Sequence, residues 1–152
     1  MDSVYVASGK PTTNYWQGPM IMVGKESSGI GKCQGLLRFD LPSLNRGDVV
    51  IDAQLYAAQI KCDAYSNTTP DAAIEVHAVT SSWNKKTVTW NTKPSFESTT
   101  ADFEILKAGG DQWETRKWNV TSIVKRWYEN TSFPNYCLLY TSPSPRDVEE
   151  SR

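Results

Sequence analysis

Eight short segments rich in β-branched and aromatic residues dominate this sequence, and turn-forming residues separate them. Each segment is four to eight residues long, with glycine, proline, asparagine or serine clusters between them. The segments cover residues 3–6, 20–24, 35–42, 53–60, 73–79, 87–90, 103–106 and 113–120. Many short strands with regular turn signals are typical of sandwiches and jelly rolls. The sequence therefore predicts an all-β, jelly-roll-like β-sandwich.

One stretch near the C-terminus departs from the β pattern. Apolar residues recur there at helical spacing, namely Val120, Ile123, Val124 and Trp127. Asn119 or Thr121 can cap the start, and Asn130 followed by Pro134 ends the pattern. This spacing predicts one short amphipathic helix over residues 119–130, with its tryptophan packed on the sandwich.

Length and charge exclude several classes of protein. The 152 residues suit one domain with a single core. Lysine and arginine number 16 against 17 acidic residues, so no net field favours nucleic acid or an anionic membrane. No apolar run is long enough for membrane insertion. No signal peptide precedes the first predicted strand, which indicates either a cytosolic chain or a piece of a longer precursor.

Side-chain alternation within the predicted strands separates inward from outward positions. It groups Leu37 with Phe39, Leu36 with Arg38, Ala53 with Leu55 and Ala57, and Val88 with Trp90. Trp90 is therefore predicted to lie in the core rather than to serve as a ligand platform. For Trp83, which precedes the turn "NKK", packing is also favoured over ligand binding.

Five stretches occur in a characteristic order: "TNYWQGPMIMVG", "GLLRFDLPSL", "VVIDAQLYAA", "IEVHAVTSSWNKKTVTWNTKPSF" and "WNVTSIVKRWYENTSFPNY". Together they resemble the disaggregatase-related, or DNRLRE, domain family, which is also classed among carbohydrate-binding modules. The resemblance covers about residues 2–136. It implies a non-catalytic β-sandwich module of a secreted or cell-surface multidomain protein. The partners that it implies are a polysaccharide and other domains of the same polypeptide.

Two positions depart from the family pattern, which usually has glycine after "TTNY" and after "PNY". Trp16 and Cys137 stand there instead. From Cys137 onward, "CLLYTSPSPRD" matches the translation of a transposon-insertion sequencing adapter. Residues 137–152 are therefore interpreted as a non-native tail. Residues 2–136 then form a single module without its natural last strand, which Leu138 and Leu139 are able to imitate.

Loop aromatics provide the candidate sugar-binding residues, because a flat ring can bury the apolar face of a pyranose. They are Trp16, Tyr15, Tyr65 and Trp113. The alternative is that these rings cover loop backbone or edge strands, and for Trp16 the two interpretations are equally weighted. If the ligand is an anionic polysaccharide, basic residues available to its carboxylates are Lys25, Arg38, Lys61, Lys85 and Lys86.

Catalytic signals are nearly absent. The single histidine, His77, is predicted on the outward side of a strand as a surface residue rather than a catalytic base. No two acidic residues can be paired by spacing as in a glycosidase. The sequence therefore predicts that the domain is not an enzyme.

No cofactor is predicted, and a structural calcium ion stays open as an alternative. The acidic residues considered for it are Asp2, Asp40, Asp63 and Asp71, although none lies in a loop with ligands at alternate positions. Once Cys137 is set aside, Cys33 and Cys62 remain, and their opposite strand parity favours two buried thiols over a disulfide.

Two functions are compatible with these features. The first is a carbohydrate-binding module that holds a partner enzyme near its polysaccharide, in an extracellular or cell-surface protein. The second is a structural or adhesive module of a repeat-rich cell-wall protein, with no sugar ligand of its own. Neighbouring domains in the full gene would separate the two.

Overall fold

The computed structural model describes residues 1–18, 20–26, 29–59, 72–106, 114–130, 132–133 and 135–141. Strands predominate, with one short helix, so the predicted all-β class is confirmed. The elements are β1 (Asp2–Ala7), β2 (Gly24–Glu26), β3 (Gly31–Arg38), β4 (Gln54–Gln59), β5 (Ala72–Ala78), β6 (Asp102–Leu106), β7 (Glu114–Asn119), α1 (Thr121–Glu129) and β8 (Tyr136–Thr141).

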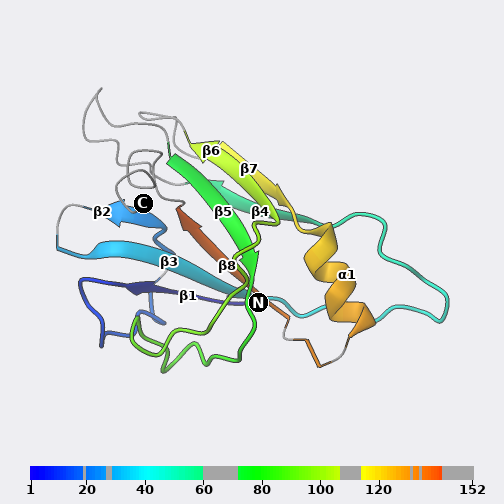
Figure 1. Ribbon diagram of the computed structural model, residues 1–152, viewed down its shortest axis with the longest axis horizontal. Helices are drawn as coiled ribbons and strands as arrows, with labels where there is room; N and C mark the ends of the chain where they lie inside the picture. The colour runs from blue at the N-terminus through cyan, green and yellow to red at the C-terminus, as the bar shows by residue number, and fades with distance from the viewer. Residues whose placement is uncertain are drawn as a thin grey trace.

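The larger sheet has the strand order β1-β3-β8-β5-β6, and every pair in it is antiparallel (Figure 1). The short strand β2 also pairs with β3, beyond the end of β8. β8 lies between β3 and β5, where Leu138 is opposite Leu36 on one side and His77 on the other. The C-terminal strand therefore joins the two halves of this sheet.

The smaller sheet consists of β4 and β7, paired antiparallel with Leu55 opposite Trp118. Its inner side chains pack with Leu37, Ile74 and Val76 of the larger sheet to form the first core cluster. Ala53 and Ala57 flank Leu55 in this cluster, as side-chain alternation predicts. The indole Nε1 of Trp118 donates a 2.8 Å hydrogen bond to the carbonyl oxygen of Ile74, which links the two sheets inside the core.

The predicted helix is present as α1, and Ile123 and Trp127 are its buried residues. They belong to the first core cluster, so the helix covers one end of the sandwich (Figure 1). The predicted N-terminal cap is wrong, because Val120 is the N-cap and no side chain forms a capping hydrogen bond, whereas Asn130 is the C-terminal cap. Among the described residues, no helix has the length and apolarity needed to cross a membrane.

A second core cluster lies on the opposite face of the larger sheet. Val4, Val6 and Leu36 form its floor, and Val79 and Val88 complete it. Residues 80–101, which are mostly irregular, cover this face. Both faces of β3 are therefore buried at Leu36 and Leu37, whereas Arg38 is exposed.

Two predicted strands are wrong. Residues 20–23 form no strand, and β2 begins only at Gly24. Residues 87–90 form turns, in which Val88 N–H donates to the Asn84 carbonyl oxygen at 2.9 Å and Thr89 N–H donates to Thr92 Oγ1 at 2.9 Å. The Asn84 side-chain oxygen also accepts a 2.8 Å hydrogen bond from Lys86 N–H, and such bonds between side chains and nearby backbone compete with a strand ladder.

The packing predictions within this segment are partly confirmed. Val88 is buried, and Trp83 and Trp90 both pack against the second core cluster. Trp90 is only half-buried, however, because it lies at the border of the cluster. The Nζ of Lys93 lies 3.6 Å from the centre of its ring.

The prediction that His77 lies on the surface is wrong, because this side chain is 0% exposed. His77 does point away from the face that carries Val76, but Phe96 and the segment after it cover that second face. The ring Nδ1 lies 2.6 Å from the Glu97 carbonyl oxygen and therefore donates to it. The histidine thus fastens the covering segment to β5.

Cys33 is a buried thiol, as predicted. Cys62, Pro134 and residues 142–152 lie outside the described residues. That Cys33 and Cys62 form no disulfide therefore stays a prediction, as does the greater part of the proposed non-native tail.

An ion pair fastens the covering segment to the helix. Both guanidinium Nη atoms of Arg126 donate to the Glu97 carboxylate, and this hydrogen bonding holds the pKa of Glu97 below its ordinary value. A lowered carboxyl pKa contributes stability above the unfolded-state pKa, and that contribution is lost as the pH falls through the folded-state value.

We therefore expect Glu97→Gln to lower stability at neutral pH, by about 0.5–1 kcal/mol because the pair is partly exposed. The difference from the parent should shrink as the pH falls below the ordinary glutamate pKa and through the lowered pKa of Glu97, because the carboxylate then protonates. Thermal unfolding of both proteins at a series of pH values measures this difference in stability. Glu129→Gln is the control, since Glu129 forms no ion pair within the described residues. A pH-independent difference for Glu97→Gln would contradict the assignment.

Candidate functional site

Two loops meet beside the edge strand β1, and Asn14 joins them. Its Nδ2 donates to the carbonyl oxygens of Lys85 at 3.0 Å and Val88 at 2.7 Å. Its Oδ1 accepts from the backbone N–H of Trp16 at 3.2 Å. One amide side chain therefore holds residues 14–18 against residues 84–88.

Trp16 projects from the first of these loops. A hydrogen bond from Gly18 N–H to the Tyr15 carbonyl oxygen closes a tight turn, with Trp16 at its first central position. The indole side chain is 39% exposed, and the Lys86 Nζ lies 5.2 Å from its ring centre. The turn thus presents a partly exposed aromatic ring with a cation over it.

Of the other three candidates, Tyr15 lies within the described residues. Tyr15 is half-buried, and its ring stacks on that of Tyr5 with centres 4.4 Å apart, so one of its faces is already covered. This packing fits the structural interpretation better than a sugar platform. Tyr65 and Trp113 lie outside the described residues.

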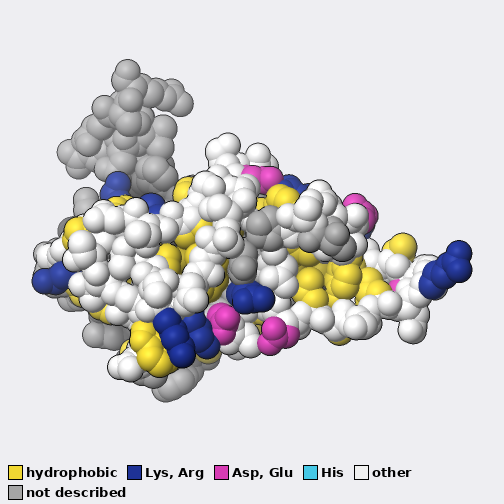
Figure 2. Space-filling view, turned by 90° about the horizontal axis from the view of Figure 1, so that it is seen from below, with side chains coloured by type: hydrophobic (Ala, Val, Ile, Leu, Met, Phe, Trp, Pro, Cys, Tyr) yellow, Lys and Arg dark blue, Asp and Glu magenta, His cyan; other side chains and the backbone are white. Residues whose placement is uncertain are grey.

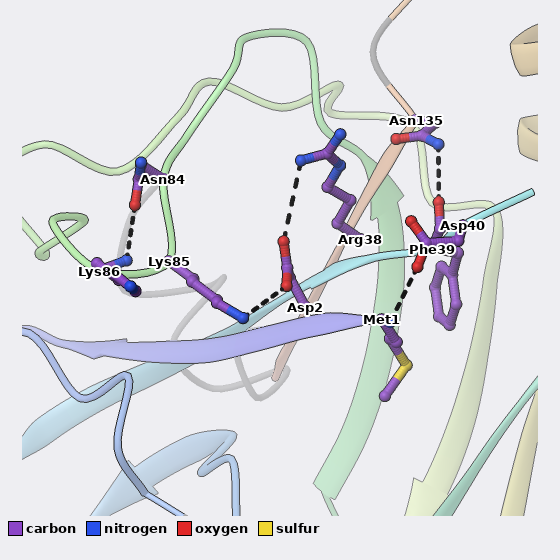
Figure 3. A network of polar contacts seen from close by, with 9 residues as sticks. All are labelled: Met1, Asp2, Arg38, Phe39, Asp40, Asn84, Lys85, Lys86 and Asn135. Atoms are coloured by element: carbon purple, nitrogen blue, oxygen red, sulfur yellow. Dashed lines mark hydrogen bonds and ion pairs between the residues drawn. The ribbon is translucent and has the colours of Figure 1, made fainter.

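A polar cluster centred on Asp2 lies next to the same loop (Figure 3). Lys85 Nζ donates to Asp2 Oδ1 at 2.9 Å, and Arg38 Nη1 lies 3.9 Å from Oδ2. The hydrogen bond from Lys85 is the main reason that the pKa of Asp2 is lowered. Lys85 and Arg38 are therefore partly neutralised, whereas Lys86 forms no ion pair with any described residue.

This arrangement puts charge and apolar surface side by side. On one face of the molecule, basic side chains lie against an apolar surface, with acidic side chains next to them (Figure 2). The remaining basic candidates, Lys25 and Lys61, have side chains outside the described set. Lys86 is thus the described cation best placed to contact a ligand bound on Trp16.

The acidic residues considered for calcium are not brought together where they are described. Asp2 is engaged with Lys85, and Asp40 Oδ2 lies 3.3 Å from the N-terminal amine. Within the described ranges, no group of three His, Cys, Asp or Glu residues is arranged to hold a metal ion. Asp63 and Asp71 fall outside those ranges.

Sequence reasoning missed Asn14, although it organises the site. The available signal was an asparagine directly before two loop aromatics, a residue type whose side chain readily bonds nearby backbone. Its partners are 71 and 74 residues away in the chain, which spacing alone does not reveal.

A comparison with protein-family models gives a match over most of the chain. No curated protein matches the sequence. The model of carbohydrate-binding module family 96 matches residues 1–143, which include all the elements from β1 to β8. The match spans most of the 152 residues, and the chain therefore belongs to carbohydrate-binding module family 96.

Proposed function

We propose that this domain is a non-catalytic module that holds a polysaccharide on the surface formed by Trp16 and Lys86. The single observation that carries the proposal is the half-exposed indole of Trp16, fixed in a tight turn beside a lysine without an ion-pair partner among the described residues. Membership of a carbohydrate-binding family supports it at the level of ligand class. We infer an extracellular or cell-surface multidomain parent from the same family relationship.

Preorganisation supports this choice of site. Asn14 fixes the Trp16 turn to the loop that carries Lys86, so little loop entropy is lost when a ligand binds. The indole can stack on the apolar face of a sugar ring, and the ammonium group can donate to hydroxyl or carboxylate oxygens. One exposed platform gives modest affinity, in a range of about micromolar to millimolar Kd.

The burial of His77 supports a non-catalytic role. His77 is the only histidine in the sequence, and its ring nitrogens face Glu97 and Glu75 inside the fold. A general base must come within hydrogen-bond reach of its substrate, and this imidazole is covered. We therefore propose that catalysis belongs to other domains of the parent protein.

Replacing Trp16 by alanine is expected to weaken polysaccharide binding about tenfold, the equivalent of one lost stacking contact. Thermal stability should stay nearly unchanged, because the ring is largely outside the core clusters. Affinity gels containing alginate, pectin, xylan, chitosan or chondroitin sulfate measure the retention of each variant.

Two control variants define the site. Tyr56→Ala removes a 61% exposed aromatic of the smaller sheet and should leave retention unaltered. Lys86→Gln should weaken retention by acidic polysaccharides only. If no polysaccharide retards the parent protein, the structural-module function replaces this one. If Trp16→Ala is retained as strongly as the parent, polysaccharide binding stands as the function and the site at Trp16 is rejected.

A further inference from the structure

An open depression of about 380 Å³ lies in the segment that follows β5, and Trp83 forms one of its walls. Trp83 is half-buried against the second core cluster, and the buried Val88 also lines the depression. This volume is near the lower end of the range for small-molecule sites. The base of the depression is therefore formed by side chains that belong to, or pack against, the second core cluster.

Uncommitted polar groups surround that base. Ser82 and Thr87 line the depression, and within the described part of the chain their hydroxyl groups have no hydrogen-bond partner. Asn84 Oδ1 accepts from Lys86 N–H at 2.8 Å, which leaves its Nδ2 group available. The rim can thus donate and accept several hydrogen bonds without breaking any that the fold uses.

The lining includes no charged side chain. A carboxylate placed here would lose hydration without gaining an ion pair, whereas a sugar hydroxyl can both donate to and accept from the rim. An indole wall with hydroxyl and amide groups around it suits one pyranose ring. We infer that this depression is a second sugar-binding subsite, for an uncharged sugar unit.

This inference rests on the proposed polysaccharide-binding function. It adds a contact of different chemistry on the same loop, because Asn84 and Thr87 line the depression while Lys86 lies beside Trp16. A polysaccharide that contacts both Trp16 and the depression would be recognised at one sugar unit by stacking and charge. Another sugar unit would be recognised by hydrogen bonds to its hydroxyl groups.

The test is a titration of the full chain with uncharged hexasaccharides of xylose, mannose and glucose, followed by ¹H–¹⁵N NMR spectra. We expect saturable shifts at the backbone amides of Ser82, Asn84 and Thr87 with at least one of them. The double variant Ser82→Ala, Thr87→Val should weaken this binding about tenfold, since it removes two hydroxyl contacts. Its stability should match that of the parent, because neither hydroxyl bonds to any described residue.

Tyr56→Ala provides the control, because this exposed ring lies on the smaller sheet and its spectra should still show the shifts in residues 82–87. If the hexasaccharides move only the amides around Trp16, or the double variant binds as tightly as the parent, the subsite is rejected and the proposed function stands. If neither a hexasaccharide nor any polysaccharide of the gel panel binds the parent, both proposals are rejected together.

Discussion

A chain that ends at Asn135 is expected to lose cooperative folding altogether. β8 pairs with β3 over Gln34–Arg38 and with β5 over Ile74–Ala78, so its removal exposes the backbone groups of both strands in the middle of the larger sheet. Buried backbone groups without partners are costly, and two new edges would have to be solvated. Because a domain is stable by only about 5–15 kcal/mol, this loss exceeds what the rest can supply. Urea unfolding followed by circular dichroism should show no cooperative transition.

A chain that ends at Thr141 is the matched control. Residues 142–152 contain Pro-Ser-Pro followed by charged residues, which offer little apolar surface to bury, so the urea midpoint should equal that of the full chain. A normal transition for the chain that ends at Asn135 would contradict the position of β8. A lower midpoint for the chain that ends at Thr141 would contradict our interpretation of these residues as an unpacked tail.

The strand β8 forms from residues that the sequence assigns mostly to a non-native tail. The adapter-like residues were expected to imitate a lost strand through Leu138 and Leu139, and the structure pairs them with Leu36 and Gly35 of β3. A sheet requires backbone hydrogen bonds and apolar side chains, and a segment of suitable composition supplies both whatever its origin. The family match continues to residue 143, so it includes the start of the proposed non-native tail.

Local patterns predicted most of the architecture because they depend on neighbours in the chain. Alternation in residues 53–57 and helical spacing from Val120 to Trp127 each correspond to a buried face in the structure. Predictions failed where distant segments decide the outcome. His77 is buried because residues 96–101 cross over its strand, and no pattern within residues 73–79 reveals that cover.

The site was less predictable than the fold for the same reason. A loop position suggested exposure for Trp16, and the structure places it at the surface. Tyr15 has an equally suitable sequence context, yet its ring stacks on Tyr5. The difference arises from the tight turn after Tyr15 and from the hydrogen bonds of Asn14 to a loop about seventy residues away. Sugar binding by Trp16 itself stays a prediction.

Trp118→Ala is expected to lower the free energy of unfolding by about 4 kcal/mol, near the middle of the range for buried aromatic truncations. The indole is 3% exposed between the two sheets, so its removal leaves a cavity in the first core cluster. It also leaves the Ile74 carbonyl oxygen without the indole N–H that bonds it. Trp118→Phe keeps an aromatic ring but loses this donor and part of the indole volume, so it should cost less than Trp118→Ala. Chemical unfolding of each variant provides the measurement.

Trp90→Ala is the comparison variant, because the sequence predicts Trp90 in the core and the structure places it half-buried. Its truncation should cost about 1–2 kcal/mol, less than for Trp118, since one side of the ring already contacts Lys93 rather than the core. Equal losses for Trp118→Ala and Trp90→Ala would mean that the second core cluster contributes as much as the first. An unchanged midpoint for Trp118→Ala would contradict the packing of the smaller sheet on the larger one.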